Sequence, residues 1–572
     1  MKFVLITIIS LLISSSWAVD RTWWKYATMY EVFLKSFKDS NGDGIGDLKG
    51  INSKLDYFVD IGVDTVWVTP FYPSAGADGG YDITDFYGID PTYGTMADFE
   101  QLLREMKRRG LNFIMDLVIN HSSDEHDWFQ KSINKIDKYT DYYIWADPKG
   151  YDENKNPIPP NDWPSIFNFY KKSSSWTWNE KRRQFYFHQF GVKQPDFNLR
   201  NDELKKDLKA IMKFWLDKGV TSFRVDATPF FMEDPLLRDD DFEEQLTQIA
   251  AGNKNGFSHR LNHPDTYTFL NEFYLFLRQY DRINKKERQS VMMAEAYGDI
   301  KILMNYFGVG KMPVVHFPFN FQLTRLRQYF DAQQMTDYLN IWLKNIPEGA
   351  ASNWALGNHD QGRIFNRFSK EYNYILLTLV SMLPGTSIIY YGEEMTQEFL
   401  DFTPERKKDL WVERDQFRLP MQWDDSLNAG FTSAEKPWVP LHPGYWHTNV
   451  EAQKVQQNSS LNYYKDLTSI RKTEVSKFGD MEFYTISKWV LAFTRTYHQS
   501  TYVIVLNLGM ESSLVDLHSS MSNLPTTLLV AAASPNSGYK KRQKFSTVSS
   551  GDNFSVLRPH SSVVLSTEEE LR

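Results

Sequence analysis

Carboxylate residues end, or lie within, several short apolar runs of this sequence. There are four of them: Asp116 in residues 113–118, Asp226 at the end of residues 222–226, Glu295 at the end of residues 291–295, and Asp360 in the cluster Asn358-His359-Asp360. A buried carboxylate is unfavourable unless it has a partner or a task, so four in such positions indicate chemistry. Carboxyl groups in pairs can serve as a nucleophile and a general acid/base.

Apolar runs and helical patterns alternate along most of the chain, which predicts a parallel sheet. The predicted strands are residues 65–68, 113–118, 222–226, 291–295 and 387–391, and the predicted helices include residues 97–109 and 202–218. Strand–helix alternation over this length favours a (β/α)8 TIM barrel over an open sheet. The carboxyl ends of barrel strands open into the active site, so we expect the four carboxylates to meet there.

Two segments depart from this alternation. Residues 121–190 are rich in loops, proline and aromatic residues, which predicts an insertion after the third strand. From residue 478 onward, short alternating strands without helices predict an antiparallel β-sandwich. The predicted organisation is a signal peptide (1–18), a catalytic barrel (19–120 and 191–477), a loop-rich inserted B subdomain (121–190) and a C-terminal β-sandwich domain (478–572).

The N-terminus has the pattern of a secretory signal peptide. Lys2 precedes an apolar run, residues 3–13, and the small residues up to Ala18 offer a cleavage site. The run is shorter than the roughly 20 apolar residues of a membrane span, and no later segment is long enough. We therefore expect a secreted protein without a membrane span, with N-glycans at the sequons that begin at Asn458 and Asn553.

The composition excludes some classes of function. The 572 residues carry a formal net charge of −8 and contain no block rich in Lys and Arg, which argues against a nucleic-acid ligand. There is no cysteine, so a cysteine nucleophile and a thiolate metal site are excluded. Aromatic residues make up 15% of the chain, and they could form either a large core or platforms for sugar rings.

A separate run, residues 39–47, is typical of calcium ligation. Its candidate ligands are the side chains of Asp39, Asn41, Asp43 and Asp47 and the carbonyl of Ile45. These are hard oxygen ligands at close spacing, and the intervening glycines permit a tight turn. The run begins like an EF-hand, although Gly50 stands where that motif has its bidentate Glu. We predict a structural Ca²⁺ site, with a solvated Asp/Gly turn as the alternative, and no organic cofactor.

Five motifs resemble those of the α-amylase superfamily, glycoside hydrolase family 13. They are Asp-Leu-Val-Ile-Asn-His (116–121), Gln-Pro-Asp-Phe-Asn (194–198), Gly-Val-Thr-Ser-Phe-Arg-Val-Asp-Ala (219–227), Met-Met-Ala-Glu-Ala-Tyr (292–297) and Asn-His-Asp (358–360). The resemblance extends from about residue 22 to residue 428. It is to the α-glucosidase and oligo-1,6-glucosidase branch, and in particular to secreted insect-type maltases and sucrases.

The resemblance implies a role for each carboxylate. Asp226 is expected to be the nucleophile, Glu295 the general acid/base, and Asp360 a group that holds the sugar hydroxyls. Retaining glycosidases place their two carboxyl groups about 5 Å apart. Arg224 lies two residues before Asp226, on the same strand face, so we expect it to lower the pKa of Asp226 and keep it ionised. His121 and His359 are expected to hydrogen-bond the same glucose.

The resemblance also implies the shape of the sugar site. In Asp78-Gly79-Gly80-Tyr81, the Tyr81 ring is expected to stack beneath the glucose, and Asp78 to close the far end by pairing with Arg414. Arg418 is the alternative partner. A closed end implies release of single glucose units, and Phe167 is expected to form the wall beyond the cleaved bond.

These motifs predict an exo-acting retaining α-glucosidase for sucrose, maltose or short oligosaccharides, in a setting such as the gut lumen. Ala227 after the nucleophile resembles members that act on α-1,4 links or sucrose more than members strict for α-1,6 links. One alternative is a sucrose-acting transglucosidase or isomerase, which uses the same covalent intermediate. Another is a catalytically inactive relative of the amino-acid transporter subunits, although this sequence keeps all three carboxylates.

Overall fold

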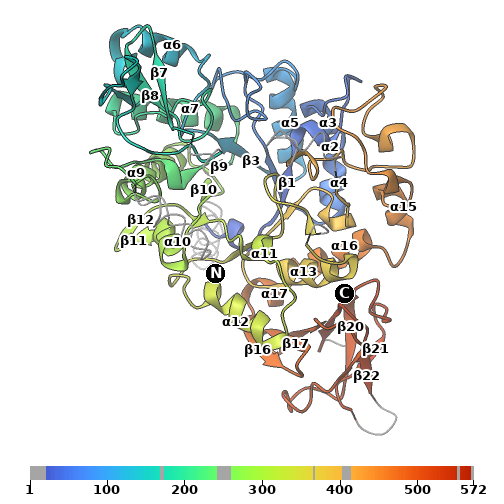
Figure 1. The fold of residues 1–572 in the computed structure, drawn as a ribbon. Coiled ribbons are helices and arrows are strands. Elements are labelled where there is room, and N and C mark those ends of the chain that lie inside the picture. The colour runs from blue at the N-terminus through green and yellow to red at the C-terminus, as the bar shows by residue number, and fades with distance from the viewer. Residues whose placement is uncertain are drawn as a thin grey trace, which may run out of the picture. The chain divides into compact units, whose positions relative to one another are not determined.

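The computed structural model describes residues 21–167, 173–240, 259–364, 367–401, 414–549 and 554–567. The predicted signal peptide and Asn553 lie outside these residues. The chain divides into two compact units, and each is described by itself. The described part of the first consists of residues within 21–25, 72–88 and 114–318, and that of the second of residues within 26–71, 89–113 and 319–567. Figure 1 labels their elements.

The first unit holds four parallel strands in the order β13-β10-β9-β3. They are β3 (Asn112–Leu117, of which 114–117 belong to this unit), β9 (Ser222–Val225), β10 (Val291–Ala294) and β13 (Phe317–Pro318). The helices that connect them are α7 (Asp202–Lys218), α9 (Pro264–Ile283) and α10 (Ile300–Phe307). Asn201 caps the start of α7 by accepting from two backbone N–H groups, and Gly219 ends it in the left-handed conformation.

The chain between β3 and α7 forms an insertion that contains a small antiparallel sheet. It has the order β4-β8-β7, and the elements of this insertion are α6 (Asp127–Ile133), η3 (Asp137–Asp141), β4 (Trp145–Ala146), β5 (Gly150–Tyr151), β6 (Pro157–Ile158), β7 (Trp176–Asn179) and β8 (Gln184–Phe187). Trp163, Trp176, Phe185 and Phe187 are buried together. Much of the aromatic content of the insertion therefore forms its own core.

The second unit holds four further parallel strands in the order β2-β1-β15-β14. They are β1 (Thr28–Val32), β2 (Thr65–Val68), β14 (Asn353–Ala355) and β15 (Thr386–Tyr390). The accompanying helices are α2 (Leu34–Phe37), α3 (Leu48–Ser53), α4 (Leu55–Asp60), α5 (Met96–Arg108), α11 (Gln322–Arg325), α12 (Ala332–Leu343) and α13 (Lys370–Met382). Thr95 and Asp98 form a capping box at the start of α5.

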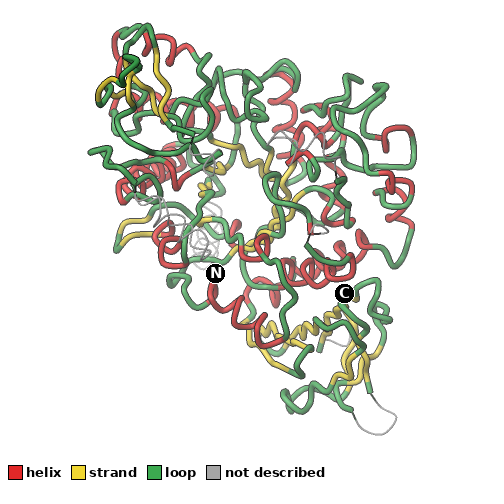
Figure 2. Tube along the Cα trace, in the orientation of Figure 1, coloured by secondary structure: helices red, strands yellow, loops and turns green. Residues whose placement is uncertain are grey.

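The C-terminal part of the second unit is an antiparallel β-sandwich, whose strands are yellow in Figure 2. Three helices lead into it: α15 (Val450–Val455), α16 (Ser460–Arg471) and α17 (Glu474–Phe478). The six-stranded sheet has the order β16 (Asp480–Thr485), β17 (Val490–Tyr497), β18 (Ser500–Asn507), β23 (Ser561–Ser566), β20 (Thr527–Ala533), β21 (Lys544–Ser546). The ribbon of β19 (Ser513–Val515) and β22 (Ser555–Leu557) shares one core with it, in which Val515 and Leu557 contact Val503 and its neighbours.

Shorter elements complete the described chain: η2 (Trp23–Tyr26), η5 (Thr228–Phe230), β11 (Gly308–Val309), β12 (Met312–Pro313), η8 (Glu393–Met395), η9 (Leu427–Gly430) and η10 (Pro443–Trp446). Within the described ranges, eight parallel strands alternate with helices in chain order, which is the (β/α)8 barrel. The predicted fold class is confirmed. The domain boundaries stay predictions.

The predicted elements agree with the observed ones, and three of the eight barrel strands had not been predicted. The predicted strand 65–68 and helix 202–218 coincide with β2 and α7. The other predicted strands and the helix 97–109 differ from the observed elements by one residue at one or both ends. The strands that were missed are β1, β13 and β14. In the part of the chain that the structure describes, no helix is both long and apolar enough to cross a membrane.

Candidate active site

The register of three neighbouring strands brings the first set of site residues together in the first unit. Asp116 on β3 is opposite Arg224 on β9, and Val225 is opposite Ala294 on β10. Asp226 and Glu295 directly follow that last pair, so they leave adjacent strands at the same level. Because side chains alternate along a strand, Arg224 and Asp226 share one face.

Arg224 binds all three carboxylates of this set. Its Nη1 donates to Asp116 Oδ1 at 2.6 Å and to Asp226 Oδ1 at 2.5 Å, and its Nη2 donates to Glu295 Oε2 at 2.6 Å. Arg224 is 3% exposed and Asp116 is fully buried. One rigid guanidinium therefore fixes the carboxyl groups of Asp226 and Glu295 relative to each other.

The protonation of this cluster differs from the sequence-based expectation. Burial raises the pKa of Asp226 well above its ordinary value; Arg224 lowers it, but the carboxyl groups of Glu295 and Asp116 raise it further. Arg224 therefore lowers the pKa of Asp226 as predicted, but the expectation of a low pKa overall was wrong, because burial and the two neighbouring carboxyl groups outweigh the guanidinium. Burial lowers the pKa of Arg224, yet the same carboxylates raise it well above its ordinary value.

Two further groups hydrogen-bond to Glu295. The N–H of Ala227 donates to Glu295 Oε2 at 3.0 Å, and the hydroxyl of Tyr297 donates to Oε1. Ala227 has a φ of 52°, in the left-handed region that is uncommon for a residue with a side chain. The sequence predicts both the motif that contains Tyr297 and the role of Glu295, but not the hydrogen bond between these two residues.

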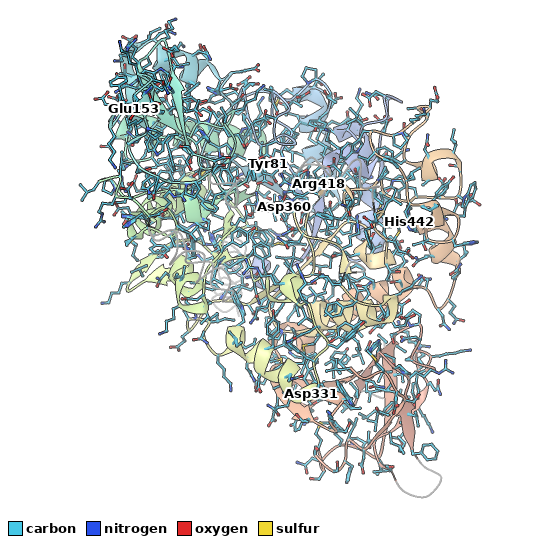
Figure 3. The ribbon with its side chains drawn as sticks, in the orientation of Figure 1. Tyr81, Glu153, Asp331, Asp360, Arg418 and His442 are labelled. Atoms are coloured by element: carbon cyan, nitrogen blue, oxygen red, sulfur yellow. The ribbon has the colours of Figure 1, made fainter. Side chains whose placement is uncertain are left out.

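Asp78, Tyr81 and His121 also lie together in the first unit. Tyr81, labelled in Figure 3, donates from its hydroxyl to Asp116 Oδ2 at 3.3 Å, and His121 Nε2 is 3.1 Å from the Tyr81 carbonyl oxygen. Gln194 Nε2 donates to Asp78 Oδ2 at 2.8 Å and is 3.1 Å from His121 Nε2. Burial lowers the pKa of His121 to about 4, so its imidazole is neutral near pH 7. Gln194, from one of the noted motifs, thus links two of the predicted sugar-binding residues.

Aromatic rings extend from His121 to Phe167. The centroid of the Phe190 ring lies 5.2 Å from that of His121 and 5.5 Å from that of Phe167. Phe230 lies 5.2 Å from Phe190 on another side. The predicted role of Phe167 beyond the cleaved bond stays a prediction.

The second set of site residues lies in the second unit, around Asp360. Arg414 Nη1 donates to Asp360 Oδ1 at 2.5 Å, and Arg418 Nη2 donates to the same oxygen at 3.0 Å. His359 Nε2 lies 3.2 Å from Asp360 Oδ2. Figure 3 labels Asp360 and Arg418. Burial raises the pKa of Asp360, but the cations of His359, Arg414 and Arg418 hold it well below its ordinary value.

Glu31 on β1 was not predicted as a site residue, although it binds His359. Its Oε1 accepts from His359 Nδ1 at 2.7 Å and from the His359 backbone N–H at 3.1 Å, and Glu31 is fully buried. Burial lowers the pKa of His359, but Asp360 and Glu31 raise it to about 9. His359 is therefore protonated near pH 7 and donates from both ring nitrogens.

Comparisons with known proteins show which family this chain is similar to. The sequence profile of one protein family, described as the α-amylase catalytic domain, matches residues 31–478. This chain belongs to the α-amylase family. Maltase A2 of Drosophila melanogaster is 37% identical over 508 residues, which cover 87% of this chain and 88% of that protein. The amino acid transporter heavy chain SLC3A1 of Homo sapiens is 37% identical over 529 residues, which cover 89% of this chain and 74% of that protein.

A solved structure has a similar fold. It is a mutant of the trehalulose synthase MutB in complex with Tris, with a TM-score of 0.81 and 29% sequence identity over 95% of this chain and 99% of that one. The relatives of this α-amylase family member are thus named as a maltase, a transporter heavy chain and a trehalulose synthase.

The predicted ion pair that would close the far end of the sugar site in this α-amylase family member is not tested by the contacts within each unit. In the second unit Arg414 binds Asp360, and in the first unit Asp78 accepts from Gln194. The predicted pairing of Asp78 with Arg414, or with Arg418, would join the two units and stays a prediction.

The predicted calcium loop of this family member is closed by its own hydrogen bonds. Asp39 accepts from the N–H groups of Asn41, Gly42 and Gly44 at 2.8–2.9 Å, and Asp43 accepts from Ile45 N at 2.8 Å. Asp47 accepts from Gly50 N at 2.7 Å as the cap of α3. Among the residues that the structure describes, no group of three or more His, Cys, Asp or Glu is arranged to hold a metal ion. The ligand types fit calcium, and the predicted site stays a prediction.

Proposed function

We propose that this chain is an exo-acting retaining α-glucosidase that hydrolyses terminal α-glucosidic bonds of sucrose, maltose or short oligosaccharides. The observation that carries the proposal is the binding of Asp226 and Glu295 by one guanidinium, Arg224, at the ends of adjacent strands. Retaining glycosidases need two carboxyl groups held at a fixed, short separation.

The reaction would run in two displacements. In the first, an Asp226 oxygen bonds to C1 of the glucose as the bond from C1 to the glycosidic oxygen breaks, and that oxygen takes the proton of Glu295. In the second, Glu295 takes a proton from water as the water oxygen bonds to C1 and the ester to Asp226 breaks. Arg224 holds both carboxyl groups in place through both steps, and the predicted roles of Asp360 and His359 at the sugar stay predictions.

The relatives support the class of substrate. Maltase A2 is named for maltose, which supports cleavage of an α-glucosidic bond here. The similarity to a trehalulose synthase favours a second candidate, in which a sugar replaces water as the acceptor of the same glucosyl group. A non-enzymatic role, which the similarity to a transporter heavy chain raises, is disfavoured because Asp226, Glu295 and Asp360 are all present.

Product analysis tests the proposal. Purified protein is supplied separately with sucrose, maltose and isomaltose, and products are followed by chromatography and by NMR of the anomeric proton. We expect glucose plus fructose from sucrose, with the glucose released first as the α-anomer, and glucose from maltose. Longer glucosides or rearranged disaccharides would favour the transferase or isomerase. β-Glucose as the first anomer from sucrose, or no cleavage of any substrate, would refute the proposal.

We also propose that Ca²⁺ binds at the loop formed by residues 39–47. The oxygen-rich side chains of the loop support this proposal. The hydrogen bonds of Asp43 are exposed to solvent, so Asp43 could exchange them for a bound ion at a lower free-energy cost than a buried residue could. At a Ca²⁺ concentration about 100 times the Kd, binding to the folded state alone would raise the free energy of unfolding by about 2.7 kcal/mol. We expect Ca²⁺ to raise the thermal midpoint over that in EGTA, and Asp43→Ala to abolish the difference. Equal midpoints with Ca²⁺ and EGTA in the wild type would exclude the site.

We further propose secretion with N-glycosylation at Asn458 and Asn553. The signal-peptide pattern of residues 1–18 supports secretion, and the exposed position of Asn458 supports glycan attachment there. Mass spectrometry of protein from the culture medium of eukaryotic cells, before and after removal of N-glycans, measures both. A mature chain that begins at residue 1, or an unmodified Asn458, would contradict the respective part.

A further inference from the structure

Glu295 accepts hydrogen bonds unequally on its two oxygens. Oε2 accepts from Arg224 Nη2 at 2.6 Å and from Ala227 N at 3.0 Å, whereas Oε1 accepts from the hydroxyl of Tyr297. A carboxylate oxygen offers about two lone-pair positions. Both positions on Oε2 therefore face N–H groups that cannot turn away, one from a guanidinium and one from the backbone.

This asymmetry decides where the acid form of Glu295 carries its proton. A proton on Oε2 would point at the hydrogens of Arg224 and Ala227, so the proton is carried on Oε1. Tyr297 donates to Oε1 and can respond to the change of protonation, because a phenol hydroxyl is both a donor and an acceptor. The backbone N–H and the guanidinium are donors only.

We propose that Tyr297 is a positioning residue for the acid/base Glu295. When the proton leaves Oε1 for the glycosidic oxygen, negative charge develops on Oε1, and the hydrogen bond from the Tyr297 hydroxyl becomes charge-assisted and stronger. An interaction that strengthens as the reaction proceeds lowers the barrier and not only the energy of the bound substrate. When water later returns a proton to Oε1, the same bond weakens again.

The positions of Tyr297 and Ala227 come from the turns that follow β10 and β9. Tyr297 lies two residues after Glu295, and its carbonyl oxygen accepts from Asn262 Nδ2 at 3.0 Å, which anchors the turn. Thr228 N and Oγ1 both donate to the carbonyl oxygen of Glu295, so the main chain of Glu295 is fixed as well. With both backbones held, the two oxygens of Glu295 keep their different partners.

The experiment compares two substrates that differ in their need for a proton. Maltose releases an alkoxide that must be protonated, whereas 4-nitrophenyl α-glucoside releases a stable phenolate. For Tyr297→Phe we expect kcat/KM on maltose to fall by about 10- to 100-fold, and on the aryl glucoside by about threefold or less, because the lost bond acts in proton transfer. kcat/KM is used because it reports the first displacement only.

Tyr280→Phe is the matched control. Tyr280 also donates its hydroxyl to a carboxylate, Asp217 Oδ1 at 2.8 Å, but on α9 and α7, away from the strand ends. We expect this variant to behave as the wild type on both substrates. Thermal unfolding of both variants checks that they fold.

The inference depends on the proposed function, and the outcomes separate the two. If the wild type cleaves neither substrate, the α-glucosidase proposal fails. If the wild type cleaves both, and Tyr297→Phe lowers the two kcat/KM values by the same factor or leaves both unchanged, the function stands and the role of Tyr297 is refuted.

Discussion

Replacing Asp226 by Asn should lower kcat/KM for maltose and for 4-nitrophenyl α-glucoside by about 10⁴-fold or more, as loss of a nucleophile does in other enzymes. An amide has the shape of a carboxylate and can still accept from Arg224, but it does not form the ester to C1. Both substrates suffer because both need that bond. The measurement is steady-state kinetics on purified protein.

Two further variants frame this result. Glu295→Gln should impair maltose cleavage far more than cleavage of the aryl glucoside, since only the first needs a proton in the first displacement. Asp217→Asn, which alters a carboxylate on α7 that accepts from Tyr280, should change neither. If Asp226→Asn and Glu295→Gln both keep most of the wild-type activity on the aryl glucoside, the assignment of the carboxylate pair is wrong.

Replacing Arg224 by Met should lower the free energy of unfolding at pH 7 by about 3–5 kcal/mol, because it leaves buried carboxylates without their cation. Asp116 is fully buried and would lose its bond of 2.6 Å to Arg224 Nη1. Without Arg224 the buried carboxylates repel one another, and protonation of a carboxylate removes part of this repulsion. The variant should therefore regain part of the lost stability as the pH falls from 7 to 5, which denaturant unfolding at the two pH values measures.

A double variant and a control variant test whether the loss of stability comes from the buried charges around Arg224. Adding Asp116→Asn to Arg224→Met removes one of the three charges and should recover part of the loss. Arg108→Gln breaks the bond of 2.8 Å to Glu105 on α5, where the arginine side chain is 65% exposed, and should cost less than about 1 kcal/mol. An Arg224→Met protein as stable as the Arg108→Gln protein would show that the cluster needs no buried cation.

The bounds of helices and strands could be predicted from the sequence where neighbouring residues determine them. The bounds of α7 were predictable because Asn201 caps its first turn and Gly219 stops it, and β2 is bounded by turn residues. β13 and β14 are only two and three residues long, too short for a periodic pattern. β1 is buried along its whole length and shows no alternation between polar and apolar residues, so periodicity did not reveal it.

The candidate site was predictable in its residues but less so in its contacts. Local motifs gave Asp226, Glu295 and Asp360, while the bond between Glu31 and His359 joins residues 328 positions apart. Only the pairing of strands brings such residues together, and a single charged residue in an apolar run does not name its partner. The raised pKa of Asp226 likewise depends first on its burial and then on the carboxyl groups of Glu295 and Asp116, which the register of β3, β9 and β10 brings beside it.

The pairing of β1 with β15 has a consequence for synthesis of the chain. Tyr30 on β1 donates to Glu394, just after β15, and the two residues are 364 positions apart. At about 5–20 residues per second, a ribosome needs roughly 20 to 70 seconds to make the intervening chain. During that time one edge of β1 lacks its neighbour, and unpaired edges of this kind promote aggregation. The nascent protein should therefore depend on chaperones until the last barrel strand has left the ribosome.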